Sequence, residues 1–179
     1  MNLYQKIEQF VTDAFTKANK PTDVFHAQRT VHWIKELKPD ADEALLIAGL
    51  AHDIDRAFNG DWKRGSFDPD FLRKHQDLSA IEVEKFMKEE NASKELVEKV
   101  KNLIANHEVG GDEEQNVLCD ADCLAYFEEK AMRWAILAKH EGKEGEMIEK
   151  IKYYFSRFKS EKAKAIARPF YDNVINFLK

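Results

Sequence analysis

The residues with the clearest chemical potential are the adjacent His52 and Asp53, which follow the apolar segment 45–51. A helix that is apolar on all sides should not end in an imidazole beside a carboxylate unless both have partners, because burying an unpaired charge is costly. One interpretation is structural: His52 is a hydrogen-bonded core histidine and Asp53 is a surface carboxylate. The other is that both side chains bind a metal ion, which supplies the positive charge that the carboxylate needs.

Two distant residues favour the metal-binding interpretation. His26 lies one predicted helix upstream of the pair, and Asp122 lies far downstream in another segment with helical apolar spacing. With His52 and Asp53 they offer two imidazoles and two carboxylates from three helices. Such a mixed set leaves positions open for water and substrate on a divalent ion, and we expect one or two ions of Mn, Fe, Co, Ni, Zn or Mg.

The segments that carry these residues have the apolar spacing of helices. We expect helices over about 2–19, 23–38, 76–90, 93–107 and 115–140, and two more within 144–178. Residues 44–51 are apolar on every side and predict a buried central helix that continues to about residue 56. Residues 58–70 form the clearest loop, in which Lys63 and Arg64 are most simply surface charges. The sequence therefore predicts an all-α fold packed on one buried helix.

Length and composition limit the class of protein. The 179 residues correspond to about one domain, so we expect a single domain over residues 1–179. The net charge of −5 argues against general nucleic-acid binding, which needs an excess of Lys and Arg. Two cysteines make no disulfide framework, and we find no membrane span and no signal peptide. We expect a cytoplasmic protein that binds no membrane.

Three short segments resemble a known family. They are residues 25–31 (FHAQRTV), 50–56 (LAHDIDR) and 121–124 (ADCL), and together they resemble the H…HD…D motif of the HD-domain superfamily of metal-dependent phosphohydrolases. The resemblance covers roughly residues 23–127 and implies an HD-type helical domain completed by helices within 128–179. It implies that His26, His52, Asp53 and Asp122 are the metal ligands. It selects Asp122 over Asp120, although Cys123 stands where the family often has a basic residue.

Two further histidines extend the resemblance to two-metal members of the family. His75 and His107 complete a pattern similar to H…HD…H…H…D, as in HD-type bacterial diadenosine tetraphosphate hydrolases and, more distantly, HD-GYP phosphodiesterases and di-iron inositol oxygenases. In a two-metal site Asp53 would bridge both ions, with His75 and His107 on the second. The structural alternative places His75 exposed at a helix start and His107 at a helix C-terminus, where it is favourable against the dipole.

Charged neighbours of the motif are candidates for substrate binding. Arg29 follows His26 by three residues and Arg56 follows His52 by four, so each can share a helical face with a ligand and bind a phosphate. The alternative for both is an ordinary ion pair. Asp55 is a candidate general acid or orienting residue. The remaining charges give no such signal: the basic residues of the last 35 positions, Arg157 among them, are balanced by glutamates and are expected on a solvated face.

The predicted reaction is hydrolysis of a phosphoester or phosphoanhydride in a small, nucleotide-like, phosphorylated substrate. A bound ion would polarise a phosphoryl oxygen and activate water, and basic residues would stabilise the charge that develops. One alternative is a di-iron oxygenase on the same scaffold. Another is a non-catalytic module that binds a metal or a nucleotide, because a shared fold does not settle activity.

Overall fold

The computed structural model describes residues 1–60 and 68–179, and within these ranges it contains helices and no strand. This confirms the predicted all-α fold. The helices are α1 Leu3–Lys17, α2 Pro21–Leu37, α3 Glu43–Ala51, α4 Asp55–Asn59, α5 Pro69–Glu89, α6 Lys94–Ile104, α7 Glu113–Ala125, the π-helical turn η1 Tyr126–Lys130, α8 Ala131–His140, α9 Glu144–Ser156 and α10 Glu161–Leu178. None of the described helices is long and apolar enough to cross a membrane.

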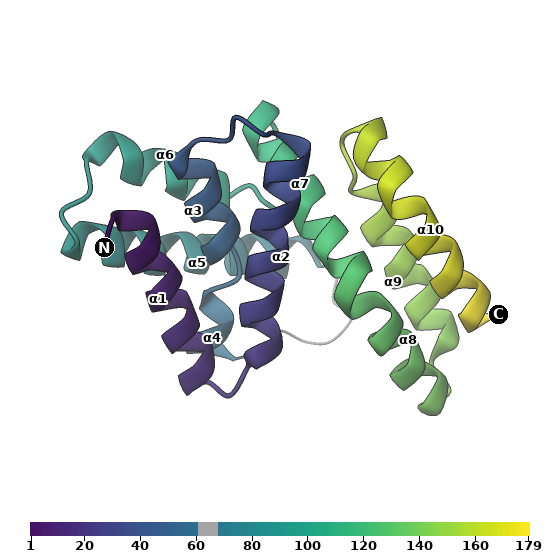
Figure 1. Ribbon diagram of the computed structural model, residues 1–179. Helices are drawn as coiled ribbons and strands as arrows, with labels where there is room; N and C mark the ends of the chain where they lie inside the picture. Colours follow the sequence, from purple (N-terminus) through teal and green to yellow (C-terminus); the bar gives the residue numbers. More distant parts are fainter. Residues whose placement is uncertain (61–67) are drawn as a thin grey trace.

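Helix α7 runs between two groups of helices, with α1 to α6 on one side and α8 to α10 on the other (Figure 1). The buried apolar side chains form two clusters that follow this division. One cluster runs from Ile7 to Ala121 and the other from Cys123 to Leu178. The predicted ligand Asp122 therefore lies on α7 at the point where one apolar cluster gives way to the other.

Helix α3 is the buried central helix that the sequence predicts, but it is shorter than expected. It ends at Ala51, and the backbone amides of Ile54 and Arg56 bond the carbonyls three residues earlier, each at 3.1 Å. The predicted continuation to residue 56 is therefore wrong. A regular helix would turn neighbouring side chains about 100° apart, whereas this tighter turn brings His52 Nε2 within 3.8 Å of Asp53 Oδ2.

The helix predicted over 115–140 is interrupted by η1, a correction that apolar spacing could not foresee. A π turn is wider than an α turn and often marks functional sites. Here the three consecutive residues that end η1 contact three different side chains of α2. Glu128 contacts Arg29, Glu129 contacts His26, and Lys130 contacts Asp23.

Helix α5 begins at Pro69, seven residues earlier than its predicted start at 76, because the Asp68 side chain caps it and proline is favourable in the first turn. His75 therefore lies well inside α5 and not at its start. The predicted loop over 58–70 overlaps α4 and α5, and Lys63 and Arg64 lie outside the described residues. Helix α6 ends at Ile104, which leaves His107 in the turn that follows.

Candidate metal centre

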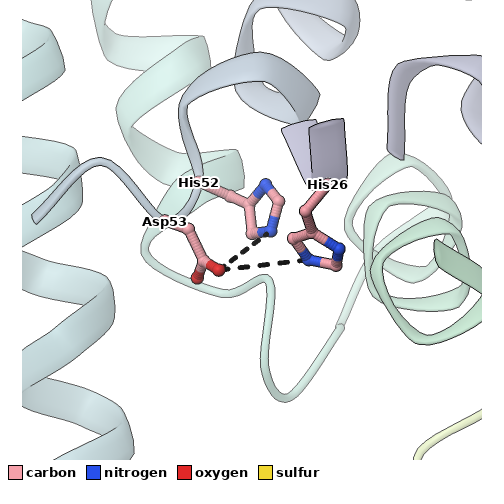
Figure 2. Close-up of side chains that lie close together, drawn as sticks. All are labelled: His26, His52 and Asp53. Carbon is pink, nitrogen blue, oxygen red and sulfur yellow. Dashed lines mark ion pairs between the residues drawn. The ribbon is translucent and has the colours of Figure 1, made fainter. Parts of the chain in front are cut away.

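The first cluster of predicted ligands, here named the first His–Asp group, consists of His26, His52 and Asp53. Figure 2 shows both imidazoles directed at the Asp53 carboxylate. The Nε2 atoms of His26 and His52 lie 3.9 and 3.8 Å from Asp53 Oδ2. These side chains come from α2 and from the turn that ends α3, so the early end of α3 contributes directly to the group.

The second His–Asp group consists of Asp53, His75 and His107. His75 Nε2 lies 2.8 Å from Asp53 Oδ1, and His107 Nε2 lies 4.0 Å from the same oxygen. The two oxygens of Asp53 therefore face different pairs of imidazoles. The Asp53 carboxylate therefore lies between imidazoles from α2 and the end of α3 on one side and imidazoles from α5 and the turn after α6 on the other.

Asp122 completes the set of six predicted ligands and lies beside the first His–Asp group. Its Oδ1 atom is 3.1 Å from His26 Nε2 and 3.6 Å from His52 Nε2. The other predicted candidate on α7, Asp120, points elsewhere. Its carboxylate accepts hydrogen bonds from the backbone amides of Lys159 and Ser160, at 2.6 and 3.0 Å, and so holds the turn before α10.

The outer nitrogen of each histidine has a fixed neighbour. His52 Nδ1 donates to the carbonyl of Gly49 at 3.0 Å, and His107 Nδ1 donates to that of Ile104 at 2.8 Å. A carbonyl only accepts, so when either ring is neutral, the form that binds a metal, its Nε2 lone pair faces the interior of the site. The Nδ1 atoms of His26 and His75 lie 2.9 Å from a Glu129 oxygen and 2.7 Å from an Asp55 oxygen. Such partners are typical of metal-binding histidines because they fix ring orientation.

The inward-facing atoms have the chemistry that a divalent ion requires. Within the described residues, the buried Nε2 atoms of His52 and His107 have no hydrogen-bond partner. Leaving a buried polar atom unpaired is costly, and native proteins rarely tolerate it without an ion or water. Imidazoles combined with carboxylates suit Mn, Fe, Co, Ni and Zn. The donor set therefore fits one or two divalent ions.

The structure treats the structural alternatives of His75 and His107 differently. His75 is almost fully buried inside α5, which contradicts an exposed position at a helix start. His107 does follow the C-terminus of α6, as its alternative places it, and its ring is fully buried there. By contrast, His32 and His140, which the sequence does not predict as ligands, are exposed.

The electrostatics of the site favour ionised carboxylates. Burial opposes ionisation of Asp53 and Asp122, but neighbouring histidines and arginines hold the pKa of each carboxyl well below its usual range. Burial lowers the pKa of His75, yet the hydrogen bonds to Asp53 and Asp55 outweigh it and raise the pKa to about 10. Burial, together with the charges of His52 and His75, lowers the pKa of His107 to about 3, which keeps this ring in the neutral form that binds metals.

The predicted substrate-binding arginines both take part in ion pairs. Arg56 Nη1 lies 3.1 Å from Asp53 Oδ2 and 3.2 Å from Asp23 Oδ1. Arg29 donates two hydrogen bonds, of 2.8 and 2.9 Å, to the carboxylate of Glu128. Each side chain keeps about a quarter of its surface exposed, so both lie at the solvent side of the site.

Comparison with known families identifies the chain. Residues 8–172 match the family described as a domain of unknown function, DUF4202. The chain belongs to the DUF4202 family. Comparison with curated proteins gives no match to this DUF4202 chain.

A solved structure has a similar fold. It is described as a predicted HD superfamily hydrolase from an uncultured Thermotogales bacterium, and it aligns with a TM-score of 0.63 and 22% identity. The alignment covers 97% of the DUF4202 chain and 88% of that chain. This likeness shows a shared fold, and the fold agrees with the helical domain that the resemblance of the sequence motifs implies.

The structure of the DUF4202 chain adds three buried charged residues that sequence reasoning missed. They are Glu108, Glu129 and Arg157. Arg157, expected on a solvated face, is 5% exposed, and that expectation is wrong because two carboxylates compensate its buried charge. The sequence carries no signal for Glu108 and Glu129, which stand among many similar charged side chains. For Arg157, the hydrophobic residues around it hint at its burial.

Proposed function

We propose that this chain is a metal-dependent phosphohydrolase that cleaves a phosphoester or phosphoanhydride bond in a small, nucleotide-like substrate. The observation that carries the proposal is the position of Asp53, whose Oδ2 faces His26 and His52 while its Oδ1 faces His75 and His107. A carboxylate shared between two sets of imidazoles is the arrangement expected of a two-metal hydrolase site. The printed description of the similar fold, a predicted HD superfamily hydrolase, supports the reaction class.

The ligand roles follow from the two His–Asp groups. In the proposed site His26, His52 and Asp122 hold one ion, His75 and His107 hold the other, and Asp53 contacts both. Bound divalent ions supply Lewis-acid chemistry to a phosphoryl group and to an attacking water. The protein fixes the direction of each imidazole through the partner of its outer nitrogen, so the ligands need little rearrangement on binding.

Two basic side chains are proposed to bind the substrate. Arg56 lies beside Asp53 and is partly exposed, so it would exchange one of its present contacts for a phosphoryl oxygen at the solvent side of the site. Arg29 is the second candidate and would exchange its contact with Glu128 for a phosphate oxygen. The fork of an arginine matches the geometry of phosphate oxygens well. Both side chains would then stabilise negative charge that develops during transfer.

Asp55 is proposed as an orienting residue. Its carboxylate is fully buried, lies 2.7 Å from His75 Nδ1 and accepts a hydrogen bond of 3.1 Å from the Ser79 hydroxyl. A carboxylate in that position fixes the ring of His75 and has no surface on which to meet a substrate. Of the two roles that the sequence leaves open, burial favours orientation over general-acid catalysis.

The proposal is tested with a panel of phosphate esters and anhydrides, including nucleotides and dinucleoside polyphosphates. We expect phosphate release by the metal-loaded protein, loss of release after chelation, and its return when Mn²⁺ is added. His52→Gln should lose the ion of the first His–Asp group and abolish turnover. His32→Gln is the matched control, because that histidine is exposed and should behave as the unaltered protein.

Three results would contradict the proposal. Turnover that survives metal removal would eliminate the metal-dependent mechanism. Two irons per chain with substrate-dependent consumption of O₂ would indicate the oxygenase alternative. Metal binding and a ligand-induced thermal shift without turnover of any ester would indicate a non-catalytic module.

A further inference from the structure

Arg157 connects the C-terminal helices to the candidate metal centre. It follows α9 directly, far along the chain from every predicted ligand, and its side chain is 5% exposed. No step of the proposed hydrolysis uses it. Burying a guanidinium is costly unless its charge and its five N–H donors find partners, so its contacts indicate what the residue does.

One contact is with the predicted ligand Asp122. Arg157 Nη2 donates to Asp122 Oδ2 at 3.0 Å, while the other oxygen, Oδ1, lies 3.1 Å from His26 Nε2. The guanidinium therefore occupies one oxygen of the carboxylate and leaves the other facing the first His–Asp group. Without this contact Asp122 would be free to rotate about its terminal torsion, which has no sharp preference of its own.

Other contacts reach the turn that carries His107. Arg157 Nε donates to the carbonyl of Glu108 at 3.2 Å, and Nη2 donates to that of His107 at 3.3 Å. Nη2 also lies 3.0 Å from Glu108 Oε2. One planar side chain thus contacts the backbone behind the second His–Asp group and the carboxylate beside the first. The carboxylates of Glu108 and Asp122 together compensate its charge.

We propose that Arg157 is a positioning residue of the metal centre, which holds Asp122 in its ligand orientation and fixes the 107–108 turn at the same time. This inference rests on the proposed function, because it gives Asp122 and His107 the role of metal ligands. It also explains why the C-terminal helices pack against the site although they carry none of the motif residues.

The test is a titration of the full-length apoprotein with Mn²⁺, with the dissociation constant of each ion as readout. Arg157→Lys keeps the positive charge but loses the fork that reaches two carboxylates and two carbonyls. We expect it to weaken the tighter ion by about 10–100-fold, the usual effect of removing a partner of a metal ligand. Phe158→Leu is the matched control, because it alters the neighbouring buried aromatic residue. It should lower the melting temperature and leave Mn²⁺ affinity unchanged.

A second variant guards against misfolding. Glu108→Gln combined with R157Q removes the guanidinium together with one of the two carboxylates that compensate it, which leaves Asp122 beside His26 and His52. The double variant should weaken the tighter ion as R157K does, because it also removes the contact between Arg157 and Asp122.

The mechanism of the effect is tested by combining R157K with D122N. If Arg157 acts through Asp122, adding R157K to D122N should weaken Mn²⁺ binding little further. Equal affinity of R157K and the unaltered protein, or two losses that multiply in full, would overturn the inference while leaving the proposed function intact. Failure of the unaltered protein to bind Mn²⁺ would overturn both.

Discussion

The two His–Asp groups share Asp53 but differ in the charge around them. The first group has a second inward-facing carboxylate, Asp122, whose Oδ1 is 3.1 Å from His26 Nε2. In the second group Glu108 is farther away, at 3.8 Å from His107 Nε2, and Asp55 contacts the outer nitrogen of His75 instead of the interior. Arg157 contacts both Glu108 and Asp122, so this contact does not distinguish the groups. More anionic ligands favour a divalent cation, so the first group should bind its ion more tightly. The comparison teaches that similar histidine pairs need not form equivalent sites.

The largest expected effect comes from the residue that both groups share. Asp53→Asn should remove both ions and reduce turnover to the level of chelator-treated protein, because an amide supplies neither the charge nor both ligand oxygens. Elemental analysis of the purified variant measures this directly. Asp40→Asn, which changes an exposed carboxylate, is the control and should keep its metal. Retention of two ions by D53N would show that the two His–Asp groups do not depend on Asp53 as a shared ligand.

The next effect separates the two groups. His107→Gln should leave about one ion per chain, bound at the first group, whereas His52→Gln should lose the tighter ion and keep only weak binding. Calorimetric titration with Mn²⁺ distinguishes the two variants by the affinity that survives. If both variants retain the same affinity, the groups are equivalent and the difference in charge has no consequence.

A smaller effect distinguishes two carboxylates on the same helix. Asp122→Asn should lower the affinity of the tighter ion by more than the roughly 10–100-fold that loss of an outer partner costs, and leave the weaker ion nearly unchanged. Asp120→Asn is its matched control. It should keep metal binding but lose roughly 2 kcal/mol of stability, because hydrogen bonds to a charged acceptor contribute about that much. Denaturant unfolding and metal titration of both variants measure these effects, and weakened metal binding in D120N would argue against the assignment.

The sequence could predict that these residues meet because their types are rare and their order is distinctive. All six predicted ligands, from His26 to Asp122, lie together in the structure. The choice of Asp122 over Asp120 came from the resemblance alone, since both lie on one helix with similar apolar neighbours. The two side chains point in different directions because they lie on different sides of α7, and these sides face different groups of helices.

Local breaks in the helices could not be predicted in the same way. Apolar spacing indicated continuous helices through residues 52–54 and 126–130, where the structure has a tight turn and a π turn. Tertiary contacts with α2 and with the site stabilise both breaks. Neither break contains a Gly or Pro that would mark it in the sequence. The partner Glu129 depends on the contact of η1 with α2, and Arg157 depends on contacts with α7 and with the turn after α6, and this is why they were missed.

The smallest expected effect involves the partner of a single imidazole. Glu129→Gln removes the charge that lies 2.9 Å from His26 Nδ1 and should weaken the tighter ion by about tenfold. Glu128→Gln is the matched control, because this neighbour contacts Arg29 and Trp33 and should leave metal affinity unchanged. Equal effects of the two variants on Mn²⁺ affinity would show that general surface charge, rather than support of His26, governs the first group.

The most direct test of the account is anomalous diffraction from crystals of the protein loaded with Mn²⁺. The account predicts two peaks, one on each side of the Asp53 carboxylate, with the peak between His26, His52 and Asp122 at the higher occupancy when the metal is limiting. Crystals that show no anomalous peak within coordination distance of Asp53, at saturating metal, would contradict it.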